Sequence, residues 1–87
     1  MGHMIKSDGS EGNWDLFRLA ELQKAVGGYV EAIKLPNNKV MLVNEEGKIR
    51  NLPINEKATM FVKAEMQGAF SDDIRGDVIV CNVGDIE

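Results

Sequence analysis

The sequence has few of the residues that most often carry chemistry, with one cysteine and one histidine among 87 residues. The lone Cys81 excludes an internal disulfide and a multi-cysteine metal site, and it is compatible with a reducing cytoplasm. His3 lies in Met1-Gly2-His3 ahead of a second methionine, Met4. This pattern is typical of an expression scar, so we expect residues 1–3 to be one. No other histidine exists to serve as a general base or a common metal ligand. We therefore expect no enzymatic activity, no metal and no cofactor.

Long apolar runs and an excess of positive charge are also missing. No apolar run approaches the length that spans a membrane, and no signal sequence opens the chain, so we expect a cytoplasmic protein without a membrane partner. The net charge of −4 disfavours sequence-independent phosphate binding, so nucleic acid is not an expected partner. Hydrophobic residues make up 44% of the chain, as in soluble folded domains. We place one domain at residues 14–87, after a flexible or edge-strand segment at residues 4–13.

The stretch from Leu22 to Ile33 predicts the end of a helix followed directly by a strand. Apolar residues at helical spacing predict a helix over 19–26, with Asp15 as an alternative start and cap. Gly27 and Gly28 follow, and a helix commonly ends at a glycine with positive φ. For that reason we predict that Gly28→Val destabilises the fold by more than about 2 kcal/mol.

A run of short apolar segments and turns predicts a three-stranded antiparallel meander. The expected strands span residues 29–35, 39–43 and 48–52. The turns between them are Pro36-Asn37-Asn38 and Asn44 to Gly47, and we expect Gly47 to take a positive φ. In the second strand, alternation places Val40 and Leu42 on one face and Met41 and Val43 on the other.

The last third of the chain predicts a helix and an interior strand. Asn55 is a preferred N-cap for the helix, and Gly68 is its expected end. Gly76 and Asp77 turn the chain into a strand over 78–83 that is apolar on both faces. The element order is then (β)-α-β-β-β-α-β, an α+β fold in which two short helices pack on a largely antiparallel, curled sheet. The residues expected to serve the backbone are Gly27, Gly28, Gly47, Asn55, Gly76 and Asp77.

Four blocks of residues carry a family resemblance. They are Leu22-Gln23-x-x-Val26-Gly27-Gly28-Tyr29-x-Glu31, Val43-Asn44-Glu45-Glu46-Gly47-Lys48, Leu52-Pro53-x-Asn55-x-x-Ala58-Thr59 and Gly76-Asp77-Val78. Together they resemble the domain of unknown function 3846, a family of small bacterial and phage proteins. The resemblance covers about residues 19–83. It implies a small cytoplasmic accessory protein often carried on mobile elements, and it brings no catalytic residue.

Glu31 is the most informative charged residue, because a carboxylate in the middle of a strand is costly unless it is paired or exposed. One interpretation is a salt bridge from Glu31 to Lys48 or Arg50. The other is a polar cleft near Asn44, shared by Glu31 and the Glu45-Glu46 tip, that binds a cationic or hydroxyl-rich ligand.

The apolar strands provide an argument for a partner. If two short helices cover only one face of the sheet, either the sheet curls around its own core or the uncovered face lies against another chain. Trp14 and Tyr29 are candidate contact residues on such a surface.

These observations leave two hypotheses for function. The first is a non-enzymatic protein-interaction module, an accessory or counter-defence factor of a phage or mobile element, whose partner is an unknown protein or a second copy. The alternative is a protein that binds or sequesters a small ligand, for example a nucleotide, in a polar cleft near Glu31.

Overall fold

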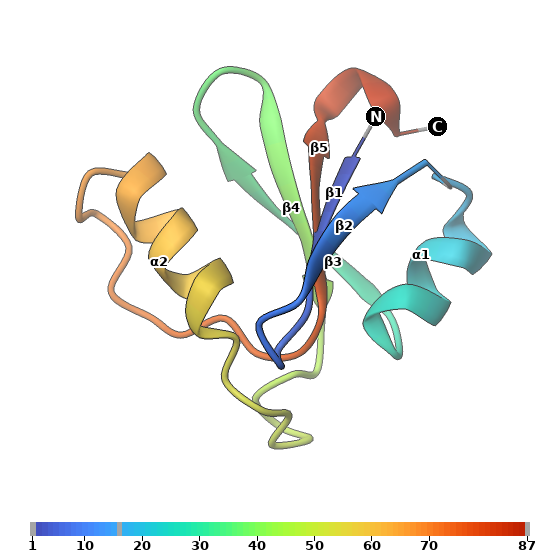
Figure 1. Ribbon diagram of the computed structural model, residues 1–87, viewed down its shortest axis with the longest axis horizontal. Coiled ribbons are helices and arrows are strands. Elements are labelled where there is room, and N and C mark those ends of the chain that lie inside the picture. Colours follow the sequence, from blue (N-terminus) through green and yellow to red (C-terminus); the bar gives the residue numbers. More distant parts are fainter. Residues whose placement is uncertain (1, 16, 87) are drawn as a thin grey trace.

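A five-stranded antiparallel sheet in the order β2-β1-β5-β4-β3 runs through the centre of the molecule. The computed structural model describes residues 2–15 and 17–86. Its elements are β1 (Gly2–Ile5), β2 (Glu11–Trp14), α1 (Leu19–Val26), β3 (Val30–Leu35), β4 (Lys39–Asn44), α2 (Glu56–Glu65), β5 (Val78–Asn82) and the short 3₁₀ helix η1 (Val83–Asp85). Figure 1 shows α1 and α2 on opposite sides of the sheet. The α+β class, the antiparallel sheet and the two short helices are confirmed.

The first helix has the predicted bounds, residues 19–26, and does not begin at the alternative start, Asp15. Arg18 is the N-cap and makes no side-chain capping bond, so the prediction that Asp15 caps the helix is wrong. Gly27 ends α1 with φ 82°, and its N–H donates to the carbonyl of Gln23 at 2.9 Å. Gly28 does not have a positive φ. A side chain is excluded there for another reason: a Cβ on Gly28 would lie 2.9 Å from Nδ2 of Asn44.

The β3–β4 hairpin forms as predicted, and alternation along β4 divides its side chains between two cores. Asn37 and Asn38 take φ values of 63° and 58° in the connecting turn. Met41 and Val43 point toward α2, whereas Val40 and Leu42 point toward α1.

The predicted third strand of the meander, residues 48–52, is not present. Residues 45–51 form successive turns, held by local bonds such as Leu52 N–H to the carbonyl of Gly47 at 2.9 Å. The physical reason is that β4 already pairs with β3 on one side and with β5 on the other, so β4 has no free edge with which residues 48–52 could pair. Gly47 also lacks the predicted positive φ; it lies buried against Arg75.

The N-terminal segment supplies two strands, β1 and β2, so the sheet still has five strands without residues 48–52. β1 lies between β2 and β5 in the interior of the sheet, so the prediction of an edge strand near Ile5 is wrong for β1. The edge strand is β2, which the sequence pattern missed because Glu11-Gly12-Asn13 carries no apolar alternation. Asp8-Gly9 makes the turn between them, with Gly9 at φ 94° and the Asp8 carboxylate accepting from Ser10 N–H at 2.8 Å.

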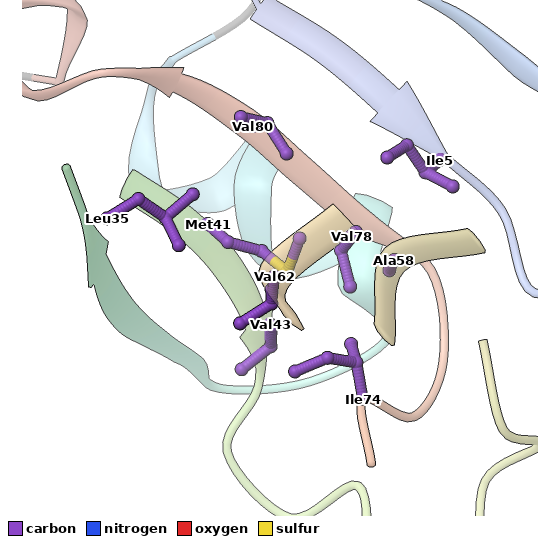
Figure 2. Packing of buried hydrophobic residues seen from close by; sticks show 9 residues of the cluster. All are labelled: Ile5, Leu35, Met41, Val43, Ala58, Val62, Ile74, Val78 and Val80. Atoms are coloured by element: carbon purple, nitrogen blue, oxygen red, sulfur yellow. The ribbon is translucent and has the colours of Figure 1, made fainter. Parts of the chain in front are cut away.

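Each face of the sheet has its own buried core. The α2-side core, drawn in Figure 2, consists of Ile5, Leu35, Met41, Val43, Ala58, Val62, Ile74, Val78 and Val80. The α1-side core consists of Leu22, Val40, Leu42, Ile79 and Cys81, with Trp14 and Phe17 packed against it. The assumption that two helices cover only one face of the sheet is therefore wrong. No face of the sheet is left uncovered, so the sheet does not need a partner chain to bury it.

Asn55 joins α2 to two strands. Its Oδ1 accepts from Ala58 N–H at 3.0 Å, which confirms the predicted N-cap. Its Nδ2 donates to the carbonyls of Ile5 and Gly76, both at 2.9 Å, while the residue is only 1% exposed. Gly76 has φ 81°, and the Asp77 carboxylate accepts from Ser7 N–H at 2.9 Å. The predicted turn at Gly76-Asp77 thus holds β5 in the central position of the sheet.

Candidate functional site

A cleft of about 360 Å³ opens at the β3 edge of the sheet, on the side of α2. We call it the edge cleft. Three parts of the chain line it: Glu31 and Ile33 of β3, residues 43–45 and 47–49 after the hairpin, and residues 70 and 72–75 after α2. The first two parts are joined by the sheet, since Glu31 pairs directly with Val43. The cleft therefore depends on the tertiary fold and not on one local segment.

The floor of the edge cleft is apolar and continuous with the α2-side core. Val43 and Ile74 are 6% and 3% exposed and belong to that core, and Ile33 and Phe70 pack against it. Ile74 is fixed from both sides: its N–H donates to Oγ1 of Thr59 at 2.9 Å, and its carbonyl accepts from Asn55 N–H at 2.7 Å. The floor is thus a rigid part of the fold.

Three carboxylates of the edge cleft, those of Glu31, Glu45 and Asp73, make no ion pair or side-chain hydrogen bond within the described parts of the chain. The salt bridge predicted from Glu31 to Lys48 or Arg50 is wrong. Lys48 pairs with Asp72, and Arg50 donates to the carbonyl of Gly27 at 2.9 Å. Glu31 instead lies exposed on an edge strand beside the cleft, where water solvates its charge.

Both cations that line the edge cleft are held by the protein itself. Lys48 and Asp72 form an ion pair across two loops, and the hydrogen bond from Lys48 is the main cause that holds the pKa of Asp72 below its usual value. Nη1 of Arg75 donates to Oδ1 of Asn51 at 3.2 Å and to the carbonyl of Leu52 at 3.1 Å. Arg75 keeps its positive charge, because both of its acceptors are neutral, and the four carboxylates and two cations of the lining leave the cleft with a net charge of −2.

Asn44 lines the edge cleft, but its side chain serves the fold. Its Nδ2 donates to the carbonyl of Val26 at 3.1 Å, at the end of α1, and its Oδ1 accepts from Glu46 N–H at 2.8 Å. These bonds use both side-chain atoms and leave the residue 4% exposed. Asn44 therefore shapes the cleft by fixing the turn that carries Glu45.

The two aromatic candidates do not line the edge cleft. Tyr29 precedes β3 and is 66% exposed, and its carbonyl accepts from Glu45 N–H at 2.8 Å. Trp14 lies on β2, at the opposite edge of the sheet, half-buried against the α1-side core. The five candidate residues thus fall in different places: Glu31, Asn44 and Glu45 come together, whereas Tyr29 and Trp14 do not join them.

Most of the edge cleft comes from residues that the sequence did not assign to a ligand site. Phe70, Asp73 and Arg75 belong to the segment between α2 and β5, which crosses to the β3 edge only because α2 packs on that face. Helical and strand periodicity indicate which face of an element is buried, but not where a long connection runs. The Ser-Asp-rich composition of 71–73 was the one local signal of an exposed loop.

Other features of the described residues offer no further site. Among residues 2–15 and 17–86, no three metal-ligating side chains form a group that could hold an ion. Cys81 lies buried in β5, and burial raises the pKa of its thiol, in agreement with a small apolar core residue. Within the same residues, no helix has the length and apolar character needed to cross a membrane.

Comparison with known proteins adds one finding. No curated protein and no solved structure matches the chain. One family model matches residues 4–87, which covers all four sequence blocks that carry the resemblance and confirms it. The chain therefore belongs to the family described as Domain of unknown function (DUF3846).

Proposed function

We propose that this domain is a non-enzymatic binder of a small ligand and that the edge cleft is its binding site. The observation that carries the proposal is the convergence of one group of residues on one hollow. Residues of two blocks that carry the family resemblance, Glu31 and the segment 43–48 without Glu46, line the edge cleft. A scaffold role alone does not require Glu31, Glu45 and Lys48 to surround a common space.

The dimensions of the edge cleft support a small ligand. Its volume of about 360 Å³ is at the lower end of small-molecule sites, which also combine an apolar lining with a few polar groups. Its polar side chains are four carboxylates, one lysine, one arginine and the amide of Asn44, and among the described residues the lining includes no cysteine, serine or histidine nucleophile. We therefore propose binding or sequestration, and not catalysis, in a cytoplasmic setting compatible with the free Cys81.

A fragment screen by NMR tests this proposal. Isotope-labelled protein would be titrated with small amines, polyols, carboxylic acids and aromatic fragments, and amide shifts recorded for every assigned residue. We expect at least one class to shift amides of residues 31–33, 43–49 and 70–75 together. If no class shifts that set, or if shifts gather elsewhere, the proposal is wrong.

A matched pair of variants on β3 provides the control for the screen. Ile33→Trp fills the edge cleft, because Ile33 is part of its floor. Ala32→Trp adds the same side chain to the neighbouring residue, which is exposed and faces the other side of the sheet. Binding should be lost in Ile33→Trp and kept in Ala32→Trp, provided that both variants give the amide spectrum of the folded protein.

A protein-interaction module is a second candidate, favoured by two exposed apolar side chains. Ile49 at the rim of the edge cleft is 84% exposed, and Tyr29 before β3 is 66% exposed. A peptide that contacts both would also pass the carboxylates of Glu31 and Glu45. The role as a phage or mobile-element accessory factor stays an expectation that the family resemblance implies.

A further inference from the structure

We infer that the edge cleft takes an alkylammonium group, a positively charged amine at the end of an apolar chain. This inference rests on the proposed function, because it names the ligand class of the same cleft. The group can belong to a free aliphatic amine or to the lysine side chain of a peptide, since both present the same chemistry.

The charge of the edge cleft is the first argument. Its lining has four carboxylates, Glu31, Glu45, Asp72 and Asp73, and two cations, Lys48 and Arg75. Lys48 is paired with Asp72, whereas Arg75 donates only to neutral acceptors and keeps its positive charge. With four carboxylates and two cations, the lining still has a net charge of −2. A ligand entering the cleft therefore meets net negative charge, which attracts an ammonium and repels the phosphates of a nucleotide.

The apolar floor is the second argument. The half-buried Ile33 and Phe70 present hydrocarbon in the cleft, and the buried Val43 and Ile74 complete its apolar lining. A bare cation or a polyol would leave this floor unused. An alkyl chain removes it from water, and each methylene that becomes fully buried raises the affinity by up to about fourfold.

The protein's own Lys48 is the third argument. Its side chain is an ammonium on a flexible four-carbon stem, and it already pairs with Asp72 at the rim of the edge cleft. Both partners are exposed, at 58% and 54% of their side-chain area, so the pair is weak and open to competition. The rim thus accommodates an alkylammonium, and Lys48 competes with a ligand for the same carboxylates.

The test is a set of NMR titrations of the full chain with matched ligands. Pentylammonium and pentanol have the same chain and differ in charge, and a series from ethyl- to pentylammonium varies the chain alone. We expect pentylammonium to bind the edge cleft more tightly than pentanol by about fivefold, the factor for one exposed ion pair. Raising salt from about 0.05 M to about 0.5 M should weaken the ammonium and not the alcohol.

Four variants locate the charge. Glu31→Gln and Glu45→Gln should each weaken pentylammonium by about threefold to fivefold. Glu46→Gln is the matched control, because it makes the same charge change next to Glu45 on a side chain outside the cleft, and its effect should be below about twofold. Lys48→Met should strengthen binding, since it removes the competing ammonium and frees Asp72.

Two further ligands distinguish the source of the ammonium. Cadaverine represents a free amine, and Nα-acetyl-lysine methylamide represents a lysine within a peptide. Tighter binding of cadaverine assigns the cleft to free amines, and tighter binding of the lysine derivative assigns it to a protein partner. Either result supports the alkylammonium inference.

Three outcomes would overturn the inference alone, and a fourth would overturn the proposed function with it. Equal binding of pentanol and pentylammonium in the cleft would remove the role of charge but leave the proposed ligand site intact. If Glu46→Gln weakens binding as much as Glu31→Gln, the attraction depends on the net charge of the protein and not on the carboxylates of the cleft. Weaker binding in Lys48→Met would show that Lys48 does not compete with the ligand. If no ligand of any class shifts the cleft amides, the proposed function fails as well.

Discussion

Asn55 contributes more to this fold than its N-cap role alone. Its side chain accepts one bond from Ala58 N–H and donates two, to the carbonyls of Ile5 and Gly76, in a nearly solvent-free position. An amide is the only side-chain group of this size with both an acceptor and two donors. The residue therefore ties α2 to the strand ends of β1 and β5.

We predict that Asn55→Ala lowers the free energy of unfolding by about 3 kcal/mol, because it removes the cap and leaves two buried carbonyls without donors. Asn55→Asp keeps the cap acceptor but places a carboxylate against those carbonyls, so it should cost at least as much. Urea denaturation measures both, with the exposed Asn13→Ala as the control. Near-native stability of Asn55→Asp would show that only the cap matters.

Gly28→Val should still destabilise the fold, but through a steric clash and not through a positive φ. Gly28 has no positive φ, but a Cβ there would lie 2.9 Å from Nδ2 of Asn44 and 3.2 Å from Nη1 of Arg50. We expect a loss of about 2 kcal/mol or more, because either side chain must give up its bond to the end of α1. The urea midpoint checks this. In the Asn44→Ala background the penalty should shrink, and an undiminished penalty would exclude Asn44 as its cause.

At the scale of elements, the connections on either side of α2 are linked by one exposed ion pair, that of Lys48 and Asp72. The pKa of Asp72 is lowered in the folded state, first by its hydrogen bond from Lys48. A carboxylate with a depressed folded pKa stabilises the fold above its unfolded pKa of about 3.9, and this stabilisation is lost as pH falls through the folded value.

Wild type should therefore be more stable than Asp72→Asn at neutral pH, and the two should converge in acid as the pH falls through the lowered folded pKa of Asp72. Urea midpoints measured across pH at low salt check this, and high salt should reduce the difference at neutral pH. Carboxylates such as Glu11 titrate in both proteins, so their contributions cancel in the comparison. A difference that persists unchanged into acid would mean that the side chain acts through packing instead of charge.

The elements that the sequence predicted well are those whose signals are local. The spacing of Leu19, Leu22 and Val26 gives the bounds of α1, and Asn55 marks the start of α2. The strand predicted at residues 48–52 is wrong because their alternation is compatible with a strand, whereas the competing pairing of β4 with β5 is a long-range property of the sheet. β2 was missed for the converse reason: its pairing with β1 holds it in place without an apolar pattern.

In the whole molecule, the placement of one helix on each face of the sheet determines which surfaces remain available for binding. Both apolar faces of β4 and β5 are covered by the chain's own residues. Three residues of the edge cleft, Glu31, Asn44 and Glu45, could be predicted because all lie on or directly after the β3–β4 hairpin. The part that comes from the connection after α2 could not, since its position depends on which face α2 covers.

This arrangement predicts that the protein is a monomer at micromolar concentration. The covered faces remove the reason to expect a homodimer, and the free edge strand β3 carries the charges of Glu31 and Lys34, which oppose edge-to-edge pairing. Light scattering coupled to size exclusion measures the mass directly. A stable dimer would show that an interface exists outside the two described cores.

Intermolecular NOEs between pentylammonium and protein with isotope-labelled isoleucine methyls would show directly whether the ligand lies in the edge cleft. Ile33, Ile49 and Ile74 line the edge cleft, whereas Ile54 and Ile86 do not. We expect NOEs from the ligand methylenes to methyls of the first three residues and none to the other two. NOEs to Ile54 or Ile86 alone, or no intermolecular NOE under conditions that saturate the protein, would contradict binding of pentylammonium in the edge cleft.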